Sequence, residues 1–339
     1  MDASLATRLS FLLTLLLLTF LPSPSSCRSL ATTMRCNKHD YKALMEIKAA
    51  LGNPYHLASW VPNTDCCNWY VVECDSTTNR IDQLTIFQAN ITGQIPAAVG
   101  DLPYLNTLVF RHITNLTGTI PSTITKLKLL TYLQLSWTNL SGPIPSFLSE
   151  LSNLDLLDLS FNQFTGSIPS SLSSLPKLIT LHLDRNRLTG QIPESFGKFK
   201  QSMYLFLSHN NLSGAIPNSF GDVDFVRIDL SRNKLEGDAS MVFKANASTQ
   251  TIDLSRNLLM FNLSKVVFDS NLLSLDISHN KIYGNIPEAI TGLNNLQFLN
   301  VSYNRLCGEI PQGGKVQNFD SYSFFHNKCL CGSPLAACK

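Results

Sequence analysis

Charged side chains are scarce in this sequence, and neither sign of charge is in clear excess. Asp, Glu, Lys and Arg make up 15% of the 339 residues, whereas an average soluble domain has about 25%. The 26 basic and 24 acidic side chains give a formal net charge of +2 at pH 7. Because such a chain has no strong positive field, we expect no nucleic acid partner. Few charges together with many Asn, Ser and Thr residues favour a surface that carries sugars outside the cell.

Long apolar segments are missing from all but the start of the chain. Arg8 precedes an apolar run at 11–21, which ends in prolines and small residues. This is the pattern of a secretory signal peptide, and the run is shorter than the roughly 20 residues that a membrane-spanning helix requires. We therefore predict a signal peptide at 1–27, cleaved somewhere within 25–31, and a soluble secreted chain without membrane insertion.

Cysteine is absent from the long middle of the chain. Cys27 lies at the signal boundary, and the other eight cysteines form two groups of four. The front group is Cys36, Cys66, Cys67 and Cys74, and the back group is Cys307, Cys329, Cys331 and Cys338. Even-numbered groups in a secreted chain predict disulfide bonds, with three possible pairings in each group, although a bond between the adjacent Cys66 and Cys67 would be strained. Because the compartment is expected to be oxidising, we expect disulfide bonds rather than a zinc site, and neither a metal nor a cofactor.

A segment such as LTGQIP or LSGPIP recurs about every 24 residues. This period predicts ten repeats over 81–308, although one repeat has Phe261 where the glycine would stand. The second repeat has one extra residue, and its turn is expected to bulge. The repeat glycines are Gly93, Gly118, Gly142, Gly166, Gly190, Gly214, Gly237, Gly284 and Gly308.

Within each repeat, leucines alternate with polar residues, which predicts a strand with one buried face. An asparagine then stands four residues before the glycine in the later repeats, and stacked buried asparagines can satisfy the backbone groups of neighbouring coils. The first three repeats have Ala89, Ile113 and Thr138 there, so that end should depend more on its cap. The asparagines are Asn162, Asn186, Asn210, Asn233, Asn257, Asn280 and Asn304.

These patterns predict an α/β solenoid, namely a right-handed leucine-rich-repeat superhelix with a parallel sheet on its concave face. Cysteine-rich caps are expected at 28–80 and 309–339. In the front cap, Asp40 is predicted to be the N-cap of a helix over 41–51, whose Leu44, Ile47 and Leu51 would cover the first coil. Trp60 and Trp69 are interpreted as core residues of this cap.

The repeat pattern GxIPxxLxxLxxLxxLxLxxNxLs is that of plant extracellular leucine-rich repeats. Together with the cap segments LASW, DCCNWYVVECD and KCLCGSPLAAC, it resembles the polygalacturonase-inhibiting proteins of plant cell walls over the whole mature chain. The resemblance implies a protein of the plant cell wall or apoplast that inhibits fungal endo-polygalacturonases by obstructing their pectin cleft. It also implies the pairings Cys36–Cys66, Cys67–Cys74, Cys307–Cys329 and Cys331–Cys338. A carrot antifreeze protein has the same architecture, so an ice-binding role stays open.

Aromatic and charged residues face the concave side of repeats three to six and their neighbours. Large exposed aromatic side chains dominate binding hot spots, and we predict that this surface binds the partner enzyme. Alternatively, the Asp and Arg columns of the face neutralise each other, each exposed pair contributing only about 0–1 kcal/mol. The predicted partner-binding residues are Phe87, Tyr132, Gln134, Trp137, Leu156, Asp158, Phe161, His182, Asp184 and Phe206.

A neighbouring column of the same face is basic, with Arg185, His209, Arg232 and Arg256 at the corresponding place of successive repeats. Because de-esterified pectin repeats a negative charge along its chain, this row could hold several galacturonate units at once. Pectin is therefore a second predicted partner.

Seven N-x-Ser/Thr sequons occur, and most fall at turns, where glycans are expected. Asn300 lies within a predicted strand of the concave face, and we expect it to be unmodified. The sequons expected to carry glycans are Asn90, Asn115, Asn139, Asn211, Asn246 and Asn262.

An enzymatic function is not expected. No Ser-His-Asp or HExxH pattern occurs, and the histidines are dispersed. Asp158 and Asp184 lie on neighbouring strands, as a glycosidase pair would, but nothing evident on an open face excludes water or raises one pKa. A receptor-like module that binds a peptide is the remaining alternative.

Overall fold

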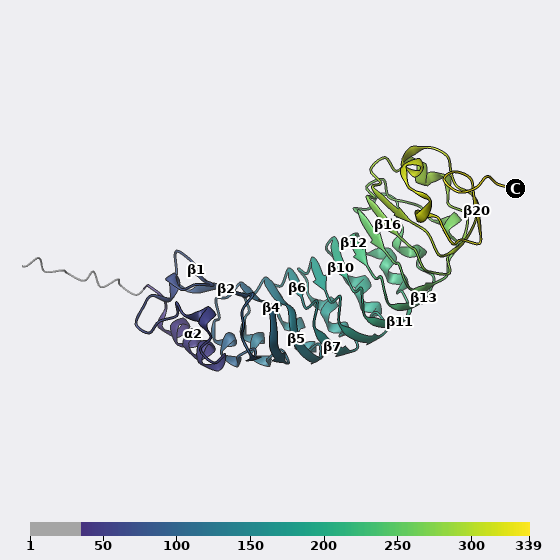
Figure 1. The fold of residues 1–339 in the computed structure, drawn as a ribbon. Helices are drawn as coiled ribbons and strands as arrows, with labels where there is room; N and C mark the ends of the chain where they lie inside the picture. The colour runs from purple at the N-terminus through teal and green to yellow at the C-terminus, as the bar shows by residue number, and fades with distance from the viewer. Residues whose placement is uncertain (1–34) are drawn as a thin grey trace, which may run out of the picture. The chain divides into compact units, whose positions relative to one another are not determined.

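Each repeat of the sequence forms one coil, and the coils stack side by side in chain order (Figure 1). The computed structural model describes residues 35–339, so the predicted signal peptide and Cys27 lie outside the described residues. The predicted leucine-rich-repeat solenoid with cysteine-rich caps is confirmed. In this part of the chain, no helix has the length and apolar character needed to span a membrane.

Ten parallel strands, each paired with the next in chain order, form the concave sheet of the described residues. Alternate side chains point inward, so that Leu157, Leu181 and Leu205 are in register on three neighbouring strands and are fully buried. A short antiparallel strand, β1 (Val72–Cys74), covers the first edge. The ten strands are β2 (Ile81–Phe87), β4 (Thr107–Gly118), β5 (Tyr132–Pro143), β6 (Leu156–Asp158), β8 (Thr180–His182), β10 (Met203–Phe206), β12 (Phe225–Asp229), β14 (Thr251–Asp253), β16 (Ser274–Asp276) and β18 (Phe298–Asn300).

After the concave strand the chain turns a corner and forms a second row of short parallel strands along the flank of the solenoid. The halves of β4 and β5 that follow the corner belong to this row as well. The other flank strands are β3 (Gly93–Gln94), β7 (Gln163–Gly166), β9 (Arg187–Gly190), β11 (Asn211–Ala215), β13 (Lys234–Gly237), β15 (Leu258–Leu259), β17 (Tyr283–Gly284), β19 (Arg305–Glu309) and β20 (Cys329–Cys331).

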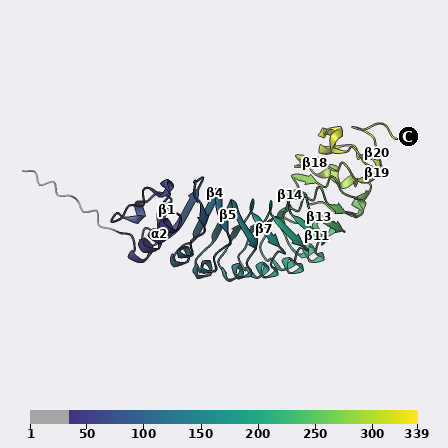
Figure 2. The same cartoon turned by 60° about the horizontal axis from the view of Figure 1, so that its bottom comes forward.

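Short 3₁₀ turns form the outer, convex side of the coils (Figure 2). Most follow the proline of the Ile-Pro motif, whose fixed φ suits the residue before the turn, as Pro145 does before the third of them. The turns are η3 (Ala97–Asp101), η4 (Ser122–Lys126), η5 (Ser146–Glu150), η6 (Ser170–Ser174), η7 (Glu194–Lys198), η8 (Asn218–Asp222), η9 (Ser240–Val242), η10 (Leu263–Lys265), η11 (Glu288–Gly292) and η12 (Gly314–Asn318).

The asparagines form the expected ladder at the corner. Asn186 donates from Nδ2 to the carbonyls of Leu159 and Leu183 at 2.9 and 3.1 Å, and its Oδ1 accepts from the amide of Phe164 at 3.0 Å. One side chain thus joins two coils. Asn327, in the C-terminal cap, likewise donates to the carbonyl of Val301 and accepts from the amide of Leu306. The ladder therefore extends one coil further than the number of sequence repeats indicated.

Coils two and three, which have Ile113 and Thr138 instead of asparagine, solve the corner differently. Their strands β4 and β5 run on through it, and the backbones of the two coils pair directly on both sides. The register shifts between Ile113 and Thr117. The bulge expected from the extra residue of the second repeat is therefore confirmed.

The front cap contains the helix α2 (Lys38–Ala50), the 3₁₀ turns η1 (Tyr55–Leu57) and η2 (Cys66–Asn68), and β1. The predicted N-cap was wrong: Asn37 caps α2 by accepting from the amide of His39. Asp40 is instead buried and binds the guanidinium of Arg80 at 2.7 and 2.8 Å and the amide of Ile81 at 3.0 Å. Its charge holds the cap helix against the first strand, a long-range role that local spacing does not reveal.

The predicted cap core is confirmed. Leu44, Ile47 and Leu51 are buried, and Trp60 and Trp69 are buried and stacked with ring centroids 5.6 Å apart. Disulfide bonds join Cys36 to Cys66, Cys67 to Cys74, Cys307 to Cys329 and Cys331 to Cys338. At the other end, η13 (Ser321–Ser323) and β20 close the solenoid.

Candidate functional site

Every coil places one residue in the left-handed conformation where the concave strand meets the corner. Their φ angles lie between +48° and +58°, a range that non-glycine residues seldom adopt. Because the same strained turn recurs in each coil, the side chains line up along the concave face; we call them the corner column. Its members are Gln88, His112, Trp137, Phe161, Arg185, His209, Arg232, Arg256, His279, Tyr303 and His326.

Four neighbouring members of the corner column stack on one another. The ring centroids of His112 and Trp137 are 4.9 Å apart, and those of Trp137 and Phe161 are 3.6 Å apart. The guanidinium carbon of Arg185 lies 4.9 Å from the Phe161 centroid. This aromatic stack, His112 to Arg185, is solvent-accessible: Trp137 is 40% exposed.

A second stack lies on the strands themselves. His182 and Phe206 are stacked with centroids 4.1 Å apart, and Arg227 lies over the outer side of Phe206 at 5.2 Å. Of the other apolar residues predicted to bind the partner, Phe87 is exposed, whereas Tyr132 and Leu156 are partly buried.

The two predicted carboxylates of this region do not project freely. Asp158 is only 9% exposed. It accepts from the amide and hydroxyl of Ser160 at 2.9 and 2.6 Å, and from Gln134 Nε2 at 2.7 Å. Asp184 is partly buried, and one of its oxygens lies 3.5 Å from His182 Nδ1. A partner would therefore meet Gln134 and His182 before these negative charges.

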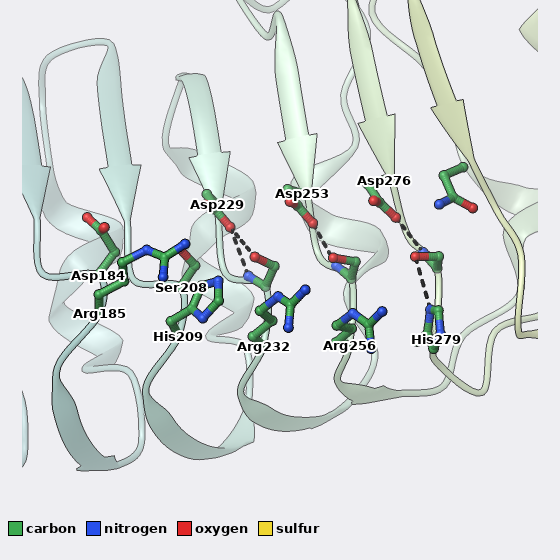
Figure 3. Close-up of a pocket in the computed structure, with 14 residues that line it drawn as sticks. Asp184, Arg185, Ser208, His209, Asp229, Arg232, Asp253, Arg256, Asp276 and His279 are labelled. Atoms are coloured by element: carbon green, nitrogen blue, oxygen red, sulfur yellow. Dashed lines mark hydrogen bonds between the residues drawn. The ribbon is translucent and has the colours of Figure 1, made fainter. Parts of the chain in front are cut away.

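The later coils form a polar groove with a volume of about 400 Å³ (Figure 3). Asp229, Asp253 and Asp276 lie in register on three adjacent strands. Each accepts from the amide of the serine two residues on, at 3.0, 2.9 and 2.9 Å respectively. The aspartate side chains are thus held against the backbone of the sheet, in a row beside the corner column.

The arginines of the corner column line the same groove as these carboxylates but differ from them in exposure. Arg185, Arg232 and Arg256 are exposed, whereas the aspartates are partly buried. Among the described residues, no Asp–Arg ion pair within 4.0 Å joins the two rows. The two columns therefore do not neutralise each other in direct ion pairs, and the arginines are the more exposed of the two.

The environment of the groove shifts the pKa values of Asp253 and His209. Burial, together with the charges of Asp229 and Asp276, raises the pKa of Asp253 to about 6. Burial and the positive charges of Arg185 and Arg232 lower the pKa of His209. At neutral pH the cations of the groove are accordingly the arginines, with His209 neutral.

The first coils carry no Asp–Ser pair and instead form a hollow of about 470 Å³. Thr85, Val109, Arg111 and Tyr132 line it together with Phe87. Sequence analysis missed Arg111, which is exposed on β4. It stands opposite Ser136 in the sheet, at the repeat position that most later coils fill with serine. An alignment of the repeats would have shown that arginine replaces serine there.

Family models for leucine-rich repeats match several parts of the chain. A leucine rich repeat N-terminal domain matches residues 37–75, and leucine rich repeats match 129–151, 153–175, 176–235 and 250–306. Among solved structures, a plant ice-binding protein is similar with a TM-score of 0.88 and 50% identity, covering 90% of this chain and 99% of that chain. The ectodomain of the receptor kinase GASSHO1/SCHENGEN3 from Arabidopsis thaliana, in complex with CASPARIAN STRIP INTEGRITY FACTOR 2, gives a TM-score of 0.66 and 34% identity, over 77% of this chain and 32% of that chain.

Several curated relatives are named as polygalacturonase inhibitors. One from Pyrus communis is 64% identical over 316 residues, covering 93% of this chain and 96% of the relative. Polygalacturonase inhibitor 1 of Arabidopsis thaliana is 61% identical over 307 residues, covering 90% and 93%. A polygalacturonase inhibitor of Vitis vinifera is 62% identical over 128 residues, so the match spans 38% of each chain.

These relatives are inhibitors, and the prediction that the chain is a binding protein rather than an enzyme is confirmed. With identities above 60% over at least 90% of its length, the chain belongs to the polygalacturonase inhibitor family of extracellular plant proteins built from leucine-rich repeats.

Proposed function

We propose that this protein inhibits fungal endo-polygalacturonases by laying its concave face over their pectin cleft. The observation that carries the proposal is the aromatic stack, in which Trp137 and Phe161 are held in contact at the centre of an exposed face. Family membership supports a polygalacturonase as the partner. Plant tissue outside the cell, in the wall or apoplast, is the compartment in which this inhibition would operate.

The geometry suits a rigid binding surface. The corner conformation fixes the backbone of each stacked residue, and the neighbouring coils fix the spacing between them. Side chains that are ordered before binding lose little entropy when a partner arrives. Aromatic residues and arginine are also the types that contribute most to interface hot spots.

The charges of the face fit the chemistry of the proposed partner. Glycoside hydrolases generally act through a pair of carboxylic residues, and Arg111 and Arg185 are exposed cations on either side of Trp137 and Phe161. The carboxylates of this region, by contrast, are recessed. Arginines at the rim of the aromatic stack would therefore be free to pair with the catalytic carboxylates of the partner enzyme.

The test is an inhibition assay against several purified fungal endo-polygalacturonases, following the reducing ends released from polygalacturonate. The secreted, oxidised protein should inhibit at least one of them. The double variant Trp137→Ala/Phe161→Ala should raise the inhibition constant at least about 30-fold with little change in Tm, because both side chains lie at the surface. Leu129→Ala, an exposed apolar residue outside the concave columns, is the matched control. Full potency of the double variant would refute this surface as the binding site.

The groove supports a second proposal, the binding of de-esterified pectin by Arg185, Arg232 and Arg256. Its specific support is that these arginines are exposed and make no ion pair with the aspartates beside them. His209, which lies between them, would contribute a hydrogen bond rather than a charge at neutral pH, because its pKa is lowered.

A further inference from the structure

The flank of the solenoid has an apolar surface at coils eight and nine. The outward positions of the flank strands are polar in the preceding coils, where they hold residues such as Thr189, Ser213 and Glu236. In coil eight, which lacks both the repeat glycine and the Ile-Pro motif, the same positions hold Leu258 and Met260, and in coil nine Tyr283. Leu258, Met260 and Tyr283 are 43%, 52% and 46% exposed. We call these three residues the flank patch.

Asn262 lies inside the flank patch. Residues 258–263 alternate between outward and buried positions, so Met260 and Asn262 point to the same side while Leu259 and Phe261 enter the core. Asn262 is directly opposite Tyr283 in the parallel pairing of coils eight and nine. The asparagine therefore has Met260 on its own strand and Tyr283 on the next one.

Asn262, Leu263 and Ser264 form a glycosylation sequon, and the amide of Asn262 is suitably disposed for it. Its Oδ1 accepts from the backbone amide of Ser264 at 3.0 Å and caps η10. Its Nδ2, the atom that would carry a sugar, makes no hydrogen bond to any described residue. In the sequon at Asn139, by contrast, Nδ2 donates to the carbonyl of Thr114 at 2.6 Å.

We propose that Asn262 carries an N-linked glycan whose first N-acetylglucosamine units cover Met260 and Tyr283. In the transfer, Nδ2 loses a proton and bonds to C1 of the sugar. The bond from C1 to the oxygen of a lipid-diphosphate donor breaks, and the lipid diphosphate leaves with the electron pair. The apolar face of the sugar ring then lies on the flank patch, which removes apolar surface from water.

The glycan has two consequences for the molecule. It stabilises coil eight, which lacks both the repeat glycine and the Ile-Pro motif, against its neighbour coil nine, and it prevents self-association through an exposed apolar surface. At coil eight the flank strand β15 pairs with the flank strand β13 and not with a concave strand, so the sugar leaves the proposed enzyme-binding face open. The inference is thus independent of the proposed inhibition.

The experiment uses the full protein secreted from a eukaryotic host, with glycopeptide mapping to establish occupancy at each sequon. Asn262→Asp removes the sequon but keeps an oxygen that can cap η10. Asn211→Asp is the matched control, because Asn211 is an exposed sequon on β11 that pairs with Thr189 rather than with apolar residues. Tm and the oligomeric state by analytical ultracentrifugation are measured for each variant.

We expect a glycan at Asn262. Its removal should lower Tm by about 2–4 °C and produce concentration-dependent dimers, whereas Asn211→Asp changes neither quantity. In a Met260→Thr/Tyr283→Ser background, which restores the polar residue types of other coils, Asn262→Asp should no longer have an effect. An unmodified Asn262 overturns the proposal. Equal responses to Asn262→Asp in both backgrounds overturn the packing of the sugar on the flank patch.

Discussion

Trp137 and Phe161 stack nearly parallel on adjacent coils, with centroids 3.6 Å apart and planes inclined by 15°. Both residues have a left-handed backbone, with φ of 54° and 53°. The contact depends on the corner geometry of two coils at once, and it converts two side chains from distant parts of the sequence into one flat surface. Such a surface can be buried by a partner without first being ordered.

The two rings should therefore act as a unit in binding. We expect Trp137→Ala and Phe161→Ala to weaken inhibition separately, and their effects on the binding free energy to be non-additive by about 0.5–1.5 kcal/mol. Inhibition constants of the four proteins in the double-mutant cycle give this coupling. Strict additivity would indicate that each ring binds the enzyme independently and that the stack has no energetic role.

Retention on polygalacturonate should depend on the arginines of the groove. Arg232→Gln/Arg256→Gln is expected to reduce retention on a pectate column. The retention that remains should depend less on salt, because fewer charges are available to be screened. Lys198→Gln/Lys200→Gln makes the same change in net charge at exposed positions in or next to η7, on the outer side. This control variant should be retained on the pectate column more strongly than the arginine variant. Salt-independent retention of the wild-type chain would contradict an electrostatic mode.

Asp253 should make the protein less stable at neutral than at acidic pH. Its folded-state pKa of about 6 exceeds the ordinary value of 3.8, so the folded chain binds the proton more tightly. The stabilisation by the proton is fully present below pH 4 and is lost as the pH rises through 6. Asp253→Asn is expected to raise the free energy of unfolding at pH 7 by about 1–2 kcal/mol and to leave it unchanged at pH 4.

The substitution at Asp253 should keep the local hydrogen bond. Asn300 occupies the corresponding place two strands further on, and it accepts from the amide of Ser302 at 3.1 Å in the same way. Urea unfolding from pH 4 to 8 measures the effect, with the exposed Asp222→Asn as control. A stabilisation that is equal at both pH values would show that charge is not its cause.

Removal of one ladder asparagine should cost more than its small volume indicates. Asn186→Ala leaves the Phe164 amide and two carbonyls of adjacent coils without partners. We expect a loss of about 2–4 kcal/mol, because each buried unsatisfied group costs about 1–3 kcal/mol. Asn294→Ala, at an exposed position, should change stability by less than about 0.5 kcal/mol. Similar losses for both variants would contradict the ladder's role.

Similarity to a plant ice-binding protein motivates a test of that activity. We expect no thermal hysteresis, because Arg185, Arg232 and Trp137 project from the concave face and interrupt any flat row of polar groups. Nanolitre osmometry at increasing protein concentration measures the freezing and melting points. A hysteresis that grows with concentration would show that a surface other than this face binds ice.

The form of a single coil follows from residue spacing within one repeat. The spacing of leucine, asparagine and the Gly-x-Ile-Pro segment recurs within single repeats, so it predicts the strand, the corner ladder and ten of the coils from local order alone. Trp60 and Trp69 could be placed in the front cap for a similar reason, since they flank a short cysteine-rich segment. The extra residue of the second repeat likewise predicted the bulge after Ile113.

The surface that the coils present to a partner depends instead on contacts between coils. The stack of Trp137 on Phe161, the recessed carboxylate of Asp158 and the raised pKa of Asp253 each depend on atoms of the adjacent coil, about 24 residues away in sequence. Asp40 in the cap pairs with Arg80 next to the first strand. Because this contact is distant in sequence, local spacing wrongly predicted Asp40 as an N-cap. Periodicity fixes which residues face outward, but the register between coils fixes which of them touch, and electrostatics and stacking act only over those contact distances.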